Sequence, residues 1–314
     1  MKYKSSSTSK NGNNIRGVSF MILVTGAAGK TGTAIIRALV ARRQSVRAFV
    51  HRKEQVEATK SIGAEETIVG DMRSLDTLSD AMEHVEAVYH ICPNMDPNEL
   101  SIGKSIIEAA RTGNVGSLVF HSVLHPQIEE MPHHWNKMRV EEALFKSGLK
   151  FTILQPGAYM QNILGEWNSI VEHEVYTVPY SLESPMSLID LEDVAQVAAT
   201  VLSEPDHVGA IYELAGPEVL TPSLIASMLE SNLGRKLRVE QISRETWKEN
   251  AERLGLGEYQ VNTLVKMFEY YDRYGLPGNP RITRTLLGRA PTRFSEFLER
   301  TAHERCKPSS SKGL

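Results

Sequence analysis

A glycine-rich turn is the first group of residues whose types and spacing could do chemistry. Residues 25–32 read TGAAGKTG, directly after an apolar run and before a segment with helical spacing. In such a turn the first glycine permits a tight bend, the second lets a pyrophosphate approach the backbone, and the third lets the helix pack on the strand. The phosphate then lies at the helix N-terminus. We therefore expect a dinucleotide to be bound by Gly26, Ala27, Ala28, Gly29, Lys30, Thr31 and Gly32.

The same turn does not match the phosphate-binding loop of nucleoside triphosphatases. That motif requires a glycine five positions before its Gly-Lys pair, and Val24 stands there. The sequence therefore disfavours a phosphate-transfer enzyme.

A basic pair follows the second predicted strand. Val50 is followed by His51, Arg52 and Lys53, where an NAD-binding protein would carry an acidic residue for the ribose 2′-hydroxyl. Arg52 and Lys53 could bind a 2′-phosphate, so the sequence favours NADP(H) over NAD(H). The alternative interpretation is a solvated helix start without a ligand.

Alternating segments must position these residues. Short β-branched runs alternate with longer amphipathic runs, which is typical of a parallel sheet with helices on both faces. The predicted fold is an α/β, doubly wound Rossmann fold. Its expected strands are 20–25, 45–50, 66–69, 87–91, 117–121 and 151–155, and its expected helices are 31–41, 54–62, 75–82, 100–112 and 137–147.

The alternation loosens after Pro156. We expect helices at 191–203 and 222–233, strands at 209–214 and 237–242, and mostly helix over 247–274. These segments predict a smaller, discontinuous C-terminal α/β lobe. The expected organisation is a disordered leader over 1–20, a nucleotide-binding domain over 21–156, a mixed region over 157–300 that serves both lobes, and a flexible tail over 301–314.

Composition excludes several classes of protein. The net charge is −3, and the first twenty residues carry four basic and no acidic side chains, so the body lacks the basic surface of a nucleic-acid-binding protein. No apolar run approaches the roughly 20 residues that cross a bilayer. Cys92 and Cys306 are the only cysteines, which predicts neither a disulfide framework nor a metal site and indicates a reducing, cytoplasmic location.

Five ordered motifs resemble the NmrA-like family, whose members are atypical short-chain dehydrogenase relatives. The motifs are TGAAGKTG, VRAFVHRK, Gly70-Asp71, HWNKMRVEEAL and FTILQPGAYMQN. The family includes NADPH-dependent quinone and dye reductases and redox-sensing co-regulators of transcription. The resemblance implies that the adenine lies near Asp71 and Met72, that the cofactor runs along Cys92, Pro93 and Asn94, and that the nicotinamide is flanked by Tyr159, Met160, Gln161 and Asn162. For several of these, burial in the core is an alternative interpretation.

The same resemblance identifies where catalytic groups would lie. Ordinary short-chain dehydrogenases pair a tyrosine with a lysine four residues later. Here Lys137 is present, but His133 takes the tyrosine's position, and Ser122 falls near the family's serine. Lys137 is expected to hold the nicotinamide ribose. His133 could act as the acid, or the segment 131–135 could be only a surface connection.

Two functions remain open. The first is an NADPH-dependent reductase that binds a quinone-like or conjugated small molecule between Tyr159 and the aromatic segment 267–271. The second is a non-catalytic NADP(H) sensor that binds a protein partner, which the missing tyrosine favours. A homodimer is compatible with either function.

Overall fold

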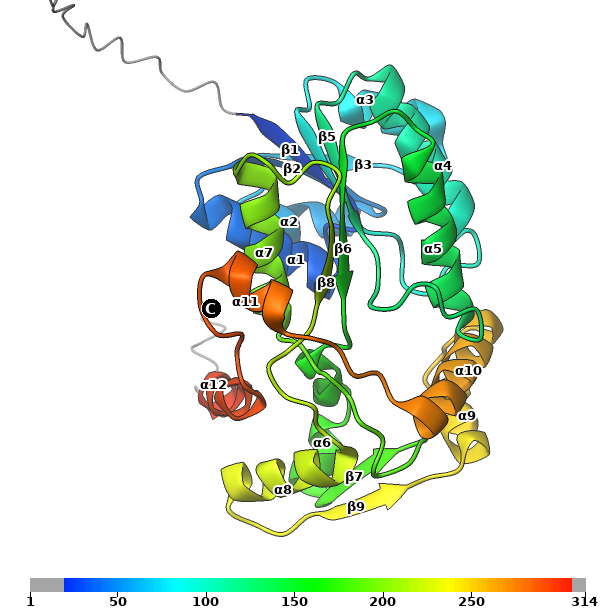
Figure 1. Ribbon diagram of the computed structural model, residues 1–314, viewed down its shortest axis with the longest axis vertical. Coiled ribbons are helices and arrows are strands. Elements are labelled where there is room, and N and C mark those ends of the chain that lie inside the picture. Colours follow the sequence, from blue (N-terminus) through cyan, green and yellow to red (C-terminus); the bar gives the residue numbers. More distant parts are fainter. Residues whose placement is uncertain (1–19, 307–314) are drawn as a thin grey trace, which may run out of the picture.

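The molecule is organised around a seven-stranded parallel sheet (Figure 1). In this computed structural model, which describes residues 20–306, the strand order is β3-β2-β1-β4-β5-β6-β8. This is the order of a dinucleotide-binding Rossmann sheet with one added edge strand. The strands are β1 (Met21–Val24), β2 (Ser45–Val50), β3 (Glu66–Val69), β4 (Ala87–His90), β5 (Ser117–His121), β6 (Phe151–Pro156) and β8 (Ile211–Leu214).

Helices cover both faces of the sheet, so that strands such as β2, β4 and β6 are buried along their whole length. One face is covered by α1 (Lys30–Ala41) and α7 (Leu191–Ser203), with the short η1 (Lys53–Gln55) and α2 (Val56–Ser61) beside them. The other face is covered by α3 (Leu75–Met82), α4 (Glu99–Thr112) and α5 (Pro132–Phe145). Figure 1 shows these groups on opposite sides of the strands.

A second lobe lies beyond the carboxyl ends of the strands (Figure 1). It contains a two-stranded parallel sheet of β7 and β9, and a core of its own. In this part of the chain, helix α10 contacts α5 of the first lobe. Helix α11 packs against α7 and β8. The elements are η2 (Met160–Gly165), α6 (Trp167–Glu172), β7 (Val175–Val178), α8 (Pro222–Leu233), β9 (Arg238–Gln241), α9 (Arg244–Arg253), α10 (Glu258–Tyr274), α11 (Arg281–Leu287) and α12 (Phe294–Cys306).

The predicted fold class is confirmed, and most predicted elements occur within one or two residues of their expected bounds. One alternative that the sequence left open was wrong. The segment 131–135 is not a surface connection, because α5 begins at Pro132, a residue suited to the first helical position, and buries His133 and His134. The expectation that 247–274 is mostly helical is confirmed, with one interruption: the first helix ends before Gly255, whose φ is +84°, and a new helix begins after Gly257.

The expected leader falls almost entirely outside the described residues. At the other end, α12 continues through residues 301–306, which were expected to belong to the tail, and the rest of that tail also lies outside the described range. Within residues 20–306, none of the helices combines the length and the apolar character that crossing a bilayer requires.

Candidate functional site

The glycine turn adopts the geometry that the sequence predicts. Gly26 has a φ of +60°, which side chains rarely adopt. A Cβ at Gly32 would lie 2.4 Å from the Gly26 carbonyl oxygen and 2.7 Å from the Ala27 Cα, so only glycine fits where α1 crosses the turn. The turn is tied to both neighbouring strands, since the Thr25 amide donates to the Tyr89 carbonyl and the Ala27 amide donates to the Phe49 carbonyl.

The start of α1 fits the pyrophosphate of a dinucleotide. Gly29 is the N-cap, no side chain caps the helix, and its first turn contains no acidic residue. The amides of that turn have no acceptor within the helix. A negatively charged ligand would satisfy them and interact favourably with the helix dipole. Lys30 and Gly29 are exposed at this point, so a phosphate could approach the backbone from solvent.

Arg52 and Lys53 are exposed at the carboxyl end of β2, next to the strand that leads into the glycine turn. Neither side chain forms an ion pair with another residue of the described range 20–306. Two cations without an ion-pair partner among the described residues, placed where a Rossmann cofactor carries its adenosine ribose, fit a 2′-phosphate.

Asp71 and Met72 follow β3 and are half-buried. Arg73 joins this segment to the one after β4, because its guanidinium lies 3.4 Å from Asp71 and 2.6 Å from Asp96. These carboxylates raise the pKa of Arg73, Asp96 more than Asp71. The ion pairs hold together two loops that the resemblance places along the cofactor.

The segment after β4 has one buried and two exposed residues. Cys92 is buried, whereas Pro93 and Asn94 are exposed. Burial raises the pKa of the Cys92 thiol well above its ordinary value, and the nearby Glu99 carboxylate acts in the same direction. Cys92 is therefore a neutral packing group and not a reactive thiolate. Gln260 of α10 donates to the Asn94 carbonyl at 3.3 Å, so α10 contacts this loop.

Lys137 is held by a residue that sequence reasoning missed. Its ammonium donates to the Glu99 carboxylate at 2.5 Å and to the His121 carbonyl at 3.3 Å. The Glu99 side chain is 2% exposed, so the pair is largely withdrawn from water. Phe120 lies beneath, with its ring centroid 5.5 Å from the ammonium. These contacts hold Lys137 at the carboxyl end of β5 with a defined direction.

His133 lies one helical turn before Lys137 and is buried. Burial, together with His134 and Lys137, lowers its pKa to about 2, and its Nδ1 has no hydrogen-bond partner within residues 20–306. His134 is also buried, with a pKa lowered to about 4, mainly by burial, and its Nδ1 contacts the His125 carbonyl at 3.1 Å. Both imidazoles are therefore neutral near pH 7, which weakens the predicted role of His133 as a proton donor.

The Ser122 hydroxyl is committed to a buried network. It donates to the Glu141 carboxylate of α5, which also accepts two bonds from the Gln155 amide at 2.9 and 3.0 Å. Burial raises the pKa of Glu141 despite these donors. The contacts indicate that Ser122 joins β5 and β6 to α5, and its predicted catalytic role stays a prediction.

His121 bridges two tyrosines. Its Nδ1 lies 2.6 Å from the Tyr89 hydroxyl, and its Nε2 lies 2.6 Å from the Tyr159 hydroxyl. Burial, Lys137 and His90 lower the pKa of His121 to about 3, so the ring is neutral. Burial also raises the pKa of Tyr159. The sequence carries no local signal for this cluster, because its members come from β4, β5 and the segment after β6.

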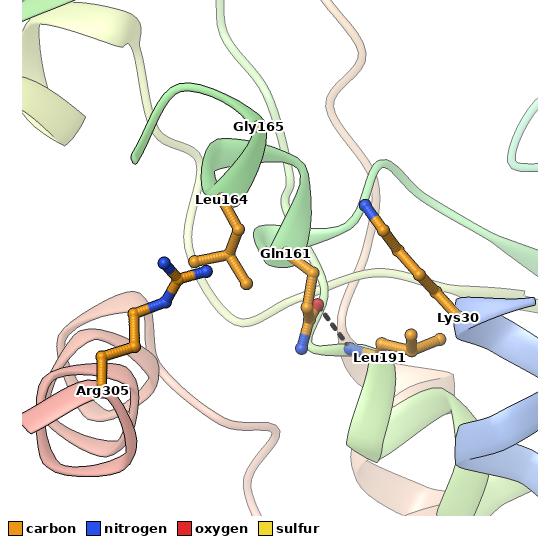
Figure 2. A pocket seen from close by; sticks show the side chains of 6 residues that line it. All are labelled: Lys30, Gln161, Leu164, Gly165, Leu191 and Arg305. Carbon is orange, nitrogen blue, oxygen red and sulfur yellow. Dashed lines mark hydrogen bonds between the residues drawn. The ribbon is translucent and has the colours of Figure 1, made fainter. Parts of the chain in front are cut away.

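The remaining residues of the segment after β6 have different neighbours. Gln161 donates to Asp190 at 2.6 Å and accepts from the Leu191 amide at 3.1 Å, so it caps α7, whereas Met160 is buried and Asn162 exposed. Gln161 lines a pocket of about 390 Å³ at the start of α1, and Figure 2 shows its side chain there beside Leu191. The lining is Lys30, Gln161, Leu164, Gly165, Leu191 and Arg305.

The predicted acceptor site between Tyr159 and the segment 267–271 is not supported. Tyr159 packs against the core beneath α1 and α7. Phe268 and Tyr271 belong to another cluster, where Phe268 lies 4.7 Å from the Trp247 ring and Tyr271 lies 5.7 Å from the Tyr180 ring. At helical spacing these aromatic residues are a core stripe of α10 and not a pocket wall.

No three His, Cys, Asp or Glu side chains of the described chain come together in an arrangement that could hold a metal ion. The groups that converge at the carboxyl edge of the sheet are instead a glycine turn, a lysine and hydroxyl donors. Such a set binds and orients an organic cofactor.

Comparison with known proteins assigns the family. The model of the NmrA-like family matches residues 19–298. The chain belongs to the NmrA-like family. The resemblance noted in the sequence is thereby confirmed.

Relatives of this NmrA-like protein extend over nearly the whole chain. An NAD(P)H azoreductase of Xenophilus azovorans is 28% identical, over 89% of this chain and 97% of its own length. The structure of the NADPH-dependent quinone oxidoreductase QOR2 of Escherichia coli, complexed with NADPH, has a TM-score of 0.80 and 24% identity, and covers 90% of this chain and 100% of its own. The triphenylmethane reductase of a Citrobacter species has a TM-score of 0.80 and 21% identity, with coverages of 91% and 100%. These two structures support the fold.

Proposed function

We propose that this NmrA-like protein is an NADPH-dependent reductase that transfers hydride to a quinone-like or otherwise conjugated small molecule. One observation carries the proposal: an uncapped helix start behind a glycine turn stands beside two exposed cations, Arg52 and Lys53. That combination matches a dinucleotide with a 2′-phosphate. The azoreductase named above agrees in the class of reaction.

The proposed site has two ends, one that binds the phosphates of the cofactor and one that binds its nicotinamide ribose. The amides at the start of α1 bind the pyrophosphate, and Arg52 and Lys53 bind the 2′-phosphate. Lys137, fixed by Glu99, holds the nicotinamide ribose. The nicotinamide, when bound, supplies the hydride.

Helix α10 closes the opposite side of the site. Its Tyr259 hydroxyl accepts from Asn136 of α5 at 3.1 Å, and its Gln260 contacts the Asn94 carbonyl after β4. Helix α10 thereby links the loop after β4 to the start of α5 beside the edge of the sheet. A conjugated acceptor needs orientation and exclusion of water more than it needs an acid, because its own π-system accepts the electron pair.

The test is a fluorescence titration of the purified protein with NADPH and with NADH, followed by a panel of quinones, azo dyes and cationic dyes. We expect NADPH to bind more tightly than NADH and to be oxidised when an acceptor is added. Lys137→Ala should weaken NADPH binding and slow turnover. Failure to bind either nucleotide would overturn the proposal.

A non-catalytic sensor is the second candidate. It is favoured by His133, which replaces the usual tyrosine and is neutral near pH 7 because burial lowers its pKa to about 2. By linkage, a partner that distinguishes the two redox states must change the nucleotide affinity by the same factor. Tight NADPH binding without oxidation by any acceptor, together with such a partner, would favour the sensor over the reductase.

A further inference from the structure

Three side chains form a continuous hydrogen-bonded line under the carboxyl edge of the sheet. Tyr89 ends in a hydroxyl 2.6 Å from Nδ1 of His121, and Nε2 of His121 lies 2.6 Å from the Tyr159 hydroxyl. Tyr89 is fully buried, whereas Tyr159 is half-buried and is the end of the line nearest to solvent. None of these contacts is used by the proposed function.

The burial of Tyr89 decides the direction of the hydrogen bonds. A neutral imidazole has one N–H donor and one acceptor nitrogen. Within residues 20–306 the Tyr89 hydroxyl has no partner other than His121. If Nδ1 carried the proton, the Tyr89 proton would be a buried donor without an acceptor, which is costly. Tyr89 therefore donates to Nδ1, and the proton of His121 is on Nε2.

That tautomer fixes what Tyr159 can do. The Nε2–H of His121 donates to the Tyr159 oxygen, so the Tyr159 hydroxyl proton cannot point back at His121. It must point elsewhere. A side-chain hydrogen bond with Thr31 of the glycine turn lowers the pKa of Tyr159, against the larger effect of burial that raises it. The Tyr159 hydroxyl thus lies between the end of β5 and the glycine turn, along the path that a cofactor takes across a Rossmann sheet.

We propose that Tyr89 and His121 orient Tyr159 as a hydrogen-bond donor to the oxygen of a bound quinone, in place of the tyrosine that is missing four residues before Lys137. This inference rests on the proposed function. Tyr159 keeps its proton and acts by stabilising charge as it develops. Tyr89 and His121 are positioning residues.

The role of Tyr159 depends on the chemistry of the acceptor. Hydride addition to a quinone gives a hydroquinone monoanion, whose negative oxygen a donor stabilises, and the monoanion then takes a proton from water. Hydride addition to the central carbon of a cationic triphenylmethane dye neutralises the dye, so no oxyanion forms. The donor should therefore assist the first reaction and not the second.

The kinetic experiment compares Tyr159→Phe with wild type on both classes of acceptor, at saturating NADPH. We expect kcat for quinones to fall by about 100- to 1,000-fold, the range that follows from losing one oxyanion donor. We expect kcat for the cationic dye to change by less than about twofold, because no oxyanion develops there. Tyr89→Phe should show the same split with a smaller loss. Tyr176→Phe, which removes a buried phenol from the second lobe, is the matched control.

Two measurements do not depend on turnover. In protein labelled with ¹⁵N-histidine, His121 should show the Nε2–H tautomer, assigned by loss of its signals in His121→Gln. Tyr89→Phe should shift it toward a mixture of tautomers. In addition, 4-nitrophenolate, an oxyanion that cannot accept hydride, should bind Tyr159→Phe more weakly than wild type by about tenfold, as expected for one charge-assisted hydrogen bond.

The outcomes separate this inference from the proposed function. If none of the acceptors supported oxidation of NADPH by the wild-type protein, the proposed function would be overturned. The His121 tautomer and the nitrophenolate affinity could still be measured in that case. Equal losses on both acceptor classes, no loss on quinones, an Nδ1–H tautomer, or unchanged nitrophenolate binding would each overturn the role of Tyr159.

Discussion

The two ends of the site are built in different ways. The end that we propose to bind the phosphates is mainly backbone, made of a glycine turn and the first amides of α1, with two exposed cationic side chains beside it after β2. The hydride end consists of side chains from β4, β5, α4, α5 and the segment after β6, joined by buried hydrogen bonds. Backbone geometry is specified by a few local residues, whereas a buried network depends on the whole fold.

The difference explains what the sequence could predict. Gly26 and Gly32 were assigned their roles from spacing alone, and the structure gives the expected φ and the expected close approach. The fold class and most of the element bounds followed from the alternation of apolar patterns. By contrast, Glu99 looked like an ordinary residue at a helix start, and nothing beside it in the sequence indicated that it faces Lys137 across two helices.

The segment 131–135 shows the same limit. Its Pro, His and Trp residues have little helical periodicity, so the pattern left open a surface connection. The burial of His133 and His134 beneath neighbouring segments determines their state, and such burial is a tertiary property. Apolar periodicity finds elements but does not identify which polar groups they bury.

The largest expected effect is at the phosphate end. In Gly32→Val the new side chain would meet backbone at 2.4 and 2.7 Å, so the turn or α1 must shift. We expect NADPH binding to be lost in the fluorescence titration and stability to fall by about 1–3 kcal/mol in denaturant unfolding. Gly257→Ala is the control, because a Cβ there meets only the end of Gln260 at 4.0 Å. Retained NADPH affinity in Gly32→Val would contradict a backbone-built phosphate site.

The next effect tests the hydride end. Glu99→Gln removes the partner of Lys137 and leaves a cation in a largely buried place. We expect stability to fall by about 3 kcal/mol, the lower end for breaking a buried pair, because Lys137 keeps some solvent contact. Turnover should fall more than NADPH affinity. Glu108→Gln, which breaks an exposed pair on the same helix, should change neither quantity. If Glu99→Gln lowered the NADPH affinity without lowering turnover, Glu99 would serve cofactor binding and not the hydride end of the site.

A smaller effect should separate the two cofactors. Arg52→Ala and Lys53→Ala each remove a cation that no described residue of the chain neutralises. We expect each to weaken NADPH binding about tenfold, as for one charge-assisted hydrogen bond, and to leave NADH binding unchanged. The difference should shrink as salt is added. Lys248→Ala on α9 serves as the control. Equal losses for both nucleotides would indicate general electrostatic attraction instead.

The smallest effect on turnover is expected from His133→Phe. A histidine whose burial lowers the pKa to about 2 cannot titrate between pH 5 and 8, so kcat should change by less than about twofold. A large fall in kcat, with a new pH dependence in this range, would restore His133 as the acid.

The same histidine should contribute to acid destabilisation. His90, His121, His133 and His134 have pKa values lowered to about 3, 3, 2 and 4, mainly by burial. Below the unfolded value of about 6.5 the unfolded chain binds more protons than the native chain, so stability falls as pH falls, by about 1.4 kcal/mol per unit for each histidine. Denaturant unfolding between pH 7 and 5 should show a shallower loss in His133→Phe than in wild type, and no such change in the exposed His303→Phe.

The carboxylates at the start of α7 have a consequence for synthesis of the chain. Asp190 and Asp193 are fully buried, and their guanidinium partners, Arg300 and Arg289, follow 110 and 96 residues later. On a ribosome the strands of the first lobe emerge long before these arginines do. Until then these two carboxylates lack their cationic partners, so the start of α7 cannot complete its native contacts. The nascent protein should therefore reach its native state only when the last helices leave the exit tunnel.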